Sequence, residues 1–271
     1  MSEDFNTGRR LYDIFSEVNN VNPKNHSVVE GWVRIFGIDA GDLTGKEDVA
    51  VEQEVARLLS LTDQQLIQLS GELGAKGLDP PVFEDSINNL RNACRARRLH
   101  RGQWKYVRQN VDGASVKTLE WADQILGGER STPIEESELQ EVAQRLRDLS
   151  EKIEERNYPP HLTEYLQSQI RQILQALRDY KIVGLEALDD AIYEAAREEM
   201  RYSQEHQPTD EDEKEAAQAR RSFWEQVKTV IEWLERAQTT AKAVGLAIRV
   251  IGAASGDQTP LPLPPSSDNV A

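Results

Sequence analysis

Hydrophobic residues in the first half of the chain recur at intervals of three and four, with polar residues between them. This spacing places the apolar side chains on one face of a helix, because an α-helix turns once every ~3.6 residues. The alternation of apolar and polar residues that indicates β-strands forms no convincing run. The pattern therefore predicts an all-α fold. The apolar positions of the first segments are Leu11, Ile14, Phe15, Val18, Val29, Trp32, Val33, Phe36, Val51, Val55, Leu58 and Leu59.

Two local features divide this half of the chain into separate helices. Thr62 and Gln65 have the spacing of an N-terminal capping box, so a new helix is expected to begin there. Pro80 and Pro81 interrupt the chain before the next apolar stripe. Residues 1–126 are therefore predicted to form an N-terminal helical domain. Its remaining apolar positions are Leu66, Leu69, Leu73, Phe83, Ile87, Leu90, Cys94, Trp104, Val107, Val111, Leu119, Ala122 and Leu126.

Residues 127–131 are predicted to form a hinge, because paired glycines resist helix formation and nothing there is apolar enough to pack. Thr132, Pro133 and Glu135 follow with the spacing of an N-cap, a first helical residue and a capping-box partner. A helix is therefore expected to begin at Thr132. It carries a heptad seam, typical of a coiled coil or a helical bundle, at Leu139, Val142, Leu146, Leu149 and Ile153.

Residues 132–255 are predicted to form a second domain, a helical bundle or hairpin array. Pro159 and Pro160 end one helix, and Gly184 marks a turn between two others. The polar residues 203–214 are expected to form an exposed connection or a helix start. Residues 256–271 contain four prolines and are expected to be a disordered tail. The apolar stripes are Leu162, Leu166, Ile170, Ile173, Leu174, Leu177, Leu185, Leu188, Ile192, Ala195, Phe223, Val227, Val230, Ile231 and Leu234.

The formal net charge of the chain is -15, which argues against general affinity for nucleic acid or for anionic membranes. Cys94 is the single cysteine, so neither a disulfide within the chain nor a cysteine metal cluster is expected. The first residues lack the basic and apolar segments of a secretory signal, and no window is apolar enough to span a membrane. These features predict a cytoplasmic protein.

The chain carries no recognisable catalytic, cofactor-binding or metal-binding motif. Residues 40–47 resemble a phosphate-binding loop, but their glycines are too close together and Glu47 stands where Ser or Thr would bind magnesium. The histidines are widely separated, and Cys94 lies on an apolar stripe. Adjacent acids such as Glu198 and Glu199 are typical of a solvated helix face. No cofactor is expected, and a non-enzymatic protein is favoured over an enzyme of unrecognised type.

Residues 86–111 carry a net positive charge, opposite to that of the whole chain, because they contain seven basic residues and no acid. The planar guanidinium of arginine suits carboxylates and phosphates, and Trp104 and Tyr106 would add stacking surfaces if they are exposed. Three interpretations are open: the segment is solvated or pairs with the protein's own acidic half, it binds an acidic protein partner, or it binds nucleic acid. The candidate partner-binding residues are Arg91, Arg95, Arg97, Arg98, Arg101, Trp104, Lys105 and Arg108.

Residues 237–255 are nearly uncharged and apolar on almost all sides, although too short to span a bilayer. A helix buried in the bundle or in a homo-oligomer is favoured. The alternative is an interfacial helix on a membrane, with Lys242 and Arg249 at the level of the headgroups. The candidate oligomer or membrane-contact residues are Leu246, Ile248, Val250 and Ile251.

The stretch from Tyr158 to Glu194 combines a proline pair, regularly spaced Leu and Ile residues, and the run Asp179–Gly184 before a new helix. In these features it resembles segments of uncharacterised bacterial all-helical proteins, some of them associated with antiphage defence loci. The resemblance implies a bacterial, defence-related setting and carries over no catalytic residue. We therefore expect a non-enzymatic protein that binds another protein, or a second copy of itself, through helical surfaces. A membrane-acting effector, peripherally associated with the membrane, is the alternative.

Overall fold

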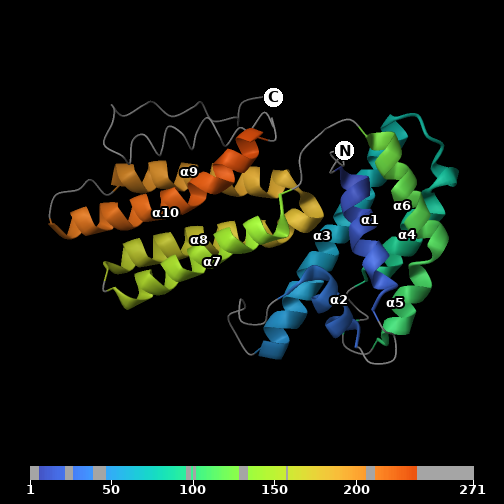
Figure 1. Ribbon diagram of the computed structural model, residues 1–271, viewed down its shortest axis with the longest axis horizontal. Coiled ribbons are helices and arrows are strands. Elements are labelled where there is room, and N and C mark those ends of the chain that lie inside the picture. The colour runs from blue at the N-terminus through green and yellow to red at the C-terminus, as the bar shows by residue number, and fades with distance from the viewer. Residues whose placement is uncertain are drawn as a thin grey trace. The chain divides into compact units, whose positions relative to one another are not determined.

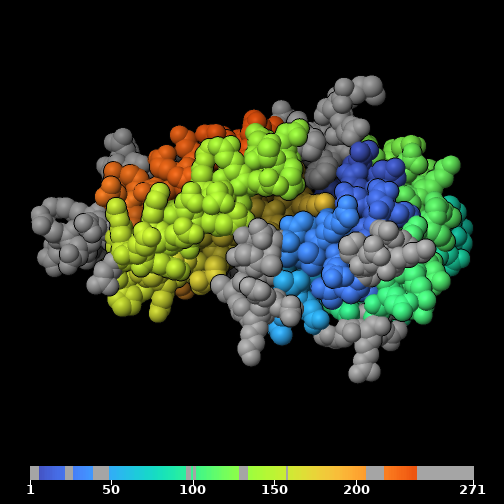
Figure 2. All heavy atoms as spheres, turned by 60° about the horizontal axis from the view of Figure 1, so that its bottom comes forward, coloured from blue at the N-terminus to red at the C-terminus, as the bar shows by residue number. Residues whose placement is uncertain are grey.

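The computed structural model of the protein describes residues 6–21, 27–38, 47–95, 99, 102–127, 134–156, 158–205 and 211–236. Within these ranges no strand is present, and Ser27 and Gln103 form an isolated bridge. The predicted all-α fold is confirmed. The helices, drawn as ribbons in Figure 1 and in space-filling form in Figure 2, are α1 (Thr7–Val18), α2 (Val28–Phe36), α3 (Glu47–Ala75), α4 (Glu84–Ala93), α5 (Trp104–Asn110), α6 (Gly113–Leu126), α7 (Glu136–Glu155), α8 (Pro160–Val183), α9 (Leu185–Glu205) and α10 (Glu211–Arg236), with a short 3-10 helix, η2 (Pro80–Val82).

The chain forms two compact units. Unit 1 contains residues 1–134 and 177–187, and unit 2 contains residues 135–176 and 188–271. Of the expected hinge at 127–131, only Gly127 lies in the described chain, where its N–H donates to the Asp123 carbonyl at 3.0 Å and α6 ends. The segments predicted for residues 237–255 and 256–271 lie outside the described residues.

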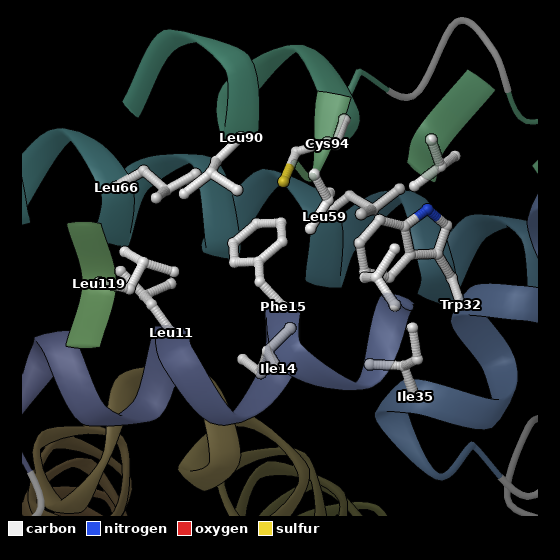
Figure 3. Packing of buried hydrophobic residues seen from close by; sticks show 14 of the residues in the cluster. Leu11, Ile14, Phe15, Trp32, Ile35, Leu59, Leu66, Leu90, Cys94 and Leu119 are labelled. Atoms are coloured by element: carbon white, nitrogen blue, oxygen red, sulfur yellow. The ribbon is translucent and has the colours of Figure 1, made fainter. Parts of the chain in front are cut away.

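The core of unit 1 forms where α1 packs against α3 and α6. Leu11, Ile14 and Phe15 are fully buried, as their spacing predicts. Phe15 rises from α1 toward the sulfur of Cys94 (Figure 3). Gly8 permits the close approach of α1 to α6, because a Cβ at this position would lie 2.6 Å from the backbone nitrogen of Asp123. The first apolar stripe of the sequence thus becomes the centre of the unit.

Helices α2 and α5 close one end of this core through two tryptophans. The rings of Trp32 and Trp104 meet edge to face, with 5.4 Å between their centroids. Gly31 of α2 lies directly against the Trp104 ring. Trp32 is fully buried as expected, whereas Val33 and Phe36 of the predicted stripe are only partly buried and pack on the margin of the core.

The helix predicted to begin at Thr62 does not begin there, and this expectation is wrong. Thr62 is fully buried in the middle of the continuous helix α3. Its Oγ1 donates to the carbonyl of Leu58 at 2.8 Å. A threonine hydroxyl in a helix is satisfied by the carbonyl four residues back, so it needs no cap. The apolar stripe through Leu59 and Leu66 consequently belongs to a single helix.

The start of α7 is also corrected. Thr132 and Pro133 lie outside the described residues, and Glu135 has extended backbone angles, φ -63° and ψ 140°. Glu135 is therefore the N-cap itself, and Glu138 is its capping-box partner. Acidic side chains at a helix start interact favourably with the positive end of the helix dipole, which explains why a glutamate serves as the cap.

Unit 2 is built from α7 and α10 together with most of α8 and α9. Helix α7 packs on α10, and the heptad seam supplies the buried residues Val142, Leu146 and Ile153. Pro160 is the first residue of α8, so the predicted break at the proline pair is confirmed. The predicted turn at Gly184 is confirmed as well, because this glycine has a φ of +81° between α8 and α9.

Candidate partner-binding surface

The Arg-rich segment lies at the end of α4 and on α5, two helices that pack against each other in unit 1. Val107 and Val111 are buried in the core and set the orientation of α5. Lys105 and Tyr106 are consequently exposed on its outer side, with Arg108 half-buried beside them. Of the remaining candidates, Arg97, Arg98 and Arg101 lie outside the described residues.

Arg91 already has an acidic partner within unit 1. Its Nε donates to Oδ1 of Asp63 on α3 at 2.8 Å. This hydrogen bond, with a smaller contribution from the charge of Asp63, raises the pKa of the Arg91 guanidinium above its ordinary value. Arg91 therefore helps to hold α4 on α3, and most of its binding capacity is used inside the unit.

Trp104 is not a stacking surface for a partner. Its side chain is fully buried against Trp32 and Gly31, so the expectation that it belongs to the partner-binding residues is wrong. The physical reason lies in the spacing of Trp104, Val107 and Val111, which places all three on one helix face. Tyr106 is the candidate stacking ring that stays accessible, with 45% of its surface exposed and the Lys105 Nζ 5.0 Å from its ring centroid.

Arg95, Lys105 and Arg108 have no acidic partner in the part of the chain that the structure describes. Arg95 and Lys105 are exposed, and the Nε of Arg108 has no hydrogen-bond acceptor. We call Arg95, Lys105, Tyr106 and Arg108 the basic surface. Arg95 and Lys105 are exposed and Arg108 is half-buried, and none of the three has a neutralising carboxylate in the described chain, which is the arrangement that an external anionic group would complete.

Unit 1 also contains an ionic cluster that local sequence patterns do not reveal. Arg57 on α3 donates to both oxygens of Asp179, at 2.6 and 2.9 Å, and to both oxygens of Glu54, at 2.8 Å. Arg178 reaches Glu54 at 3.2 Å. Burial alone would raise the pKa of Glu54, but the hydrogen bonds and charges of the two arginines outweigh it and hold the pKa below its ordinary value. The spacing of Glu54 and Arg57 is visible in the sequence, whereas Asp179 is 122 residues away from Arg57.

Arg10 occupies the interior of the same unit. Its Nε donates to the carbonyl of Ile182 at 3.0 Å, and its Nη2 donates to Thr7 and Gln65 at 3.2 Å. Burial lowers the pKa of Arg10, although the negative charge of Glu72 opposes the shift. Arg10 thereby ties α1 and α3 to the segment that ends α8.

Unit 2 buries a second polar cluster around Glu199. Its carboxylate accepts hydrogen bonds from Tyr165 at 2.8 Å, from Ser203 at 2.9 Å and from Arg220 at 2.9 Å. Tyr202 stacks on Tyr165 with 4.5 Å between ring centroids. Burial, together with the negative charge of Glu199, raises the pKa of the Tyr165 hydroxyl, which therefore stays protonated as a hydrogen-bond donor.

The Glu199 cluster corrects the expectation that the acidic pair at 198 and 199 is a solvated face. Glu198 faces Arg201 near the surface, but only 2% of Glu199 is exposed. A buried carboxylate persists when a cation and hydrogen-bond donors satisfy it, and Arg220 lies 21 residues further along the chain. These contacts to both oxygens of Glu199 join α8, α9 and α10.

The other positions considered for chemistry behave as packing residues or lie outside the described chain. Cys94 is buried in the core of unit 1, and burial raises the pKa of its thiol. In the described residues no group of three metal-binding side chains is able to hold a metal ion. Residues 39–46, which include most of the loop resembling a phosphate site, lie outside the described ranges.

The proposed contact residues near the carboxy terminus, Leu246, Ile248, Val250 and Ile251, also lie outside the described chain. Among the helices that are described, none has the length and apolar character needed to cross a membrane. Comparisons of the chain with protein families, with curated proteins and with solved structures found no match.

Proposed function

We propose that this protein is a non-enzymatic interaction protein whose basic surface binds an acidic region of another protein molecule. The observation that carries the proposal is the set of cations at Arg95, Lys105 and Arg108, which have no acidic partner in the described chain despite a net charge of -15. In so acidic a molecule, cations without an internal carboxylate are the positions where an external anion gains most.

An acidic protein suits this surface better than nucleic acid does. Single-stranded nucleic acid is bound by combining cations with several stacking platforms, and the burial of Trp104 leaves Tyr106 as the exposed ring of the described segment. A polyanion as long as nucleic acid would also meet the negative field of the whole molecule. A protein partner needs to present only a compact group of carboxylates.

The buried polar clusters support a framework role for the remainder of the fold. Glu54 and Asp179 are satisfied by Arg57 and Arg178, and Glu199 is satisfied by Arg220. Groups held in this way stabilise a unique arrangement of helices.

The test compares two matched double variants of the full chain. Arg95→Glu with Lys105→Glu reverses two cations of the basic surface, and Lys76→Glu with Lys228→Glu makes the same change at two exposed lysines elsewhere. We expect a fluorescent peptide of mixed Glu and Asp composition to bind the unaltered protein and the control pair, and to bind the first pair at least ~10-fold more weakly.

A labelled single-stranded DNA serves as the competing probe in the same anisotropy measurement. Tighter binding of the DNA than of the acidic peptide, or equal weakening by both double variants, would contradict the proposal. Thermal melting of each variant establishes that the helices remain folded. The defence setting rests on the resemblance of residues 158–194 and stays a hypothesis.

A further inference from the structure

Helix α7 of unit 2 has an acidic outer face. Its apolar residues Val142, Leu146 and Ile153 are buried, and residues on the opposite side of the helix are exposed. With ~100° between successive residues, the exposed side carries an acidic stripe. Side chains of α7 are visible at the surface in Figure 2. The acidic stripe consists of Glu141, Asp148, Glu151 and Glu155.

Part of this stripe has no cation to balance it. Helix α7 contains seven acidic residues and three basic ones. Arg145 pairs with Glu141, and Asp148 accepts a hydrogen bond from the neutral Gln144 at 2.8 Å. Glu151 and Glu155 have no ion pair in the described chain. The unbalanced negative charge therefore gathers toward the carboxy-terminal end of α7.

At this end of the helix, the unbalanced negative charge destabilises α7. The carboxy-terminal end of a helix carries the negative end of the helix dipole, so acids in the last turns are destabilising unless a cation lies near them. Glu151 and Glu155 occupy these turns, where Lys152 is the basic residue of the last turn. An external cationic surface would relieve this repulsion.

We infer that the occupant of the basic surface is the acidic stripe of α7 in a second copy of the chain. The inference rests on the proposed function and names its partner. Every copy carries both members of the pair, unneutralised cations after the end of α4 and on α5 and unneutralised acids on α7. Their charges are opposite, and Arg95, Lys105, Glu151 and Glu155 have no ion pair in the described chain.

The contact is heterologous, because different surfaces of the two copies meet. Such a contact leaves one free basic surface and one free acidic stripe on every dimer, so it continues into a ring or a filament unless the geometry closes it. It depends on exposed charges and therefore weakens with salt. Head-to-tail growth and salt sensitivity are the two properties that distinguish it from a symmetric apolar dimer.

The experiment uses two complementary variants of the full chain in analytical ultracentrifugation at low salt. One carries Arg95→Glu and Lys105→Glu, and the other carries Glu151→Lys and Glu155→Lys. We expect the unaltered protein to form dimers and larger species whose association weakens ~10-fold or more between ~50 and ~500 mM salt. Each variant alone should be monomeric, because its two surfaces then carry charges of the same sign. An equimolar mixture should again form dimers and larger species, since both contacts between the two variants join opposite charges.

A chain that carries all four substitutions is the decisive control, because both charge signs are exchanged and self-association should return. Circular dichroism verifies folding, and the milder pair Arg95→Gln and Lys105→Gln should weaken association less. A monomeric unaltered protein at low salt, or a mixture of variants that stays monomeric, overturns the inference. If the acidic peptide still binds in that case, the proposed function survives; loss of peptide binding as well removes both.

Discussion

At the scale of single residues, this protein places Arg10, Glu54 and Glu199 inside its units and satisfies each of these three with more than one contact. Arg10 is an example, since three acceptors on different segments surround its guanidinium. Burying such a group is costly unless its hydrogen bonds are complete, so the backbone around it has little freedom to change. The glycine next to Arg10 shows how tight this constraint is.

Gly184 and Gly77 provide a matched pair for measuring the space around Arg10. Both have a φ of +81°, but a Cβ on Gly184 would lie 2.9 Å from Nη1 of Arg10, whereas a Cβ on Gly77 would meet nothing within 4 Å. We expect Gly77→Ala to lower the free energy of unfolding by ~1–2 kcal/mol through backbone strain alone. Gly184→Ala should cost clearly more in urea denaturation. Equal losses would mean that Arg10 moves aside freely.

The Glu54 carboxylate should give unit 1 a measurable dependence on pH. Because the pKa of Glu54 is lower in the folded protein than its ordinary value of 4.5, its contribution is complete above that value and is lost as the pH falls through the folded-state pKa. We expect Glu54→Gln to cost ~1–2 kcal/mol near neutral pH. The difference from the unaltered protein should shrink on acidification below 4.5.

Urea denaturation at several pH values measures this effect, with Glu120→Gln as the control at an exposed glutamate of α6. The control should leave the free energy of unfolding unchanged at every pH. A loss in Glu54→Gln that is the same at acidic and neutral pH would show that the charge of Glu54 does not contribute.

At the scale of helices, close contact between elements depends on particular small residues. Gly8 lets α1 approach α6, and Gly31 lets α2 accommodate the Trp104 ring. Helix propensity alone would favour alanine at both positions, because glycine costs ~1 kcal/mol in a helix. Packing overrides propensity here, so the sign of a glycine substitution depends on what lies beside it.

Gly31→Ala and Gly71→Ala should therefore change stability in opposite directions. A Cβ on Gly31 would overlap the Trp104 ring, whereas a Cβ on Gly71 of α3 would meet nothing within 4 Å. We expect Gly31→Ala to destabilise by ~1–3 kcal/mol and Gly71→Ala to stabilise by ~0.5–1 kcal/mol. Thermal melting checks both, and a stabilising Gly31→Ala would show that α2 and α5 separate easily.

The helices were predictable to the extent that their signals are periodic. The stripes around Phe15, Leu90 and Phe223 are buried as expected, because apolar spacing reflects the burial that drives packing. The first residues of helices were less predictable. Thr62 is a residue type that caps helices, but it lies where α3 continues without a break. For the candidate surface, composition identified the Arg-rich segment. The neutralisation of Arg91 by Asp63 depends on a contact between α4 and α3 that no local pattern contains.

At the scale of the whole molecule, the two units are each stabilised by an internal ionic cluster. Glu54, Arg57 and Asp179 belong to unit 1, whereas Glu199 and Arg220 belong to unit 2. Neither cluster shares a residue with the other. Damage to one cluster should consequently be felt first in its own unit.

Arg220→Met tests this separation. The substitution leaves the buried carboxylate of Glu199 without its cation, which typically costs ~3–5 kcal/mol. We expect amide hydrogen exchange to accelerate in α10 and in the parts of α8 and α9 that belong to unit 2, with little change in α1 and α6. Arg171→Met, at an exposed position of α8, is the control. Uniform acceleration throughout the chain would show that the units open together.

The burial of Cys94 has a practical consequence. This thiol is the single cysteine of the chain, it lies beside Phe15 in the core of unit 1, and its raised pKa keeps it protonated. Thiol reagents react with the exposed thiolate, so an aromatic disulfide reagent should modify the native protein only when unit 1 opens. The reaction rate, followed by absorbance, would then report how often unit 1 opens. A second cysteine placed on the surface would accept a fluorescent dye while Cys94 stayed unlabelled.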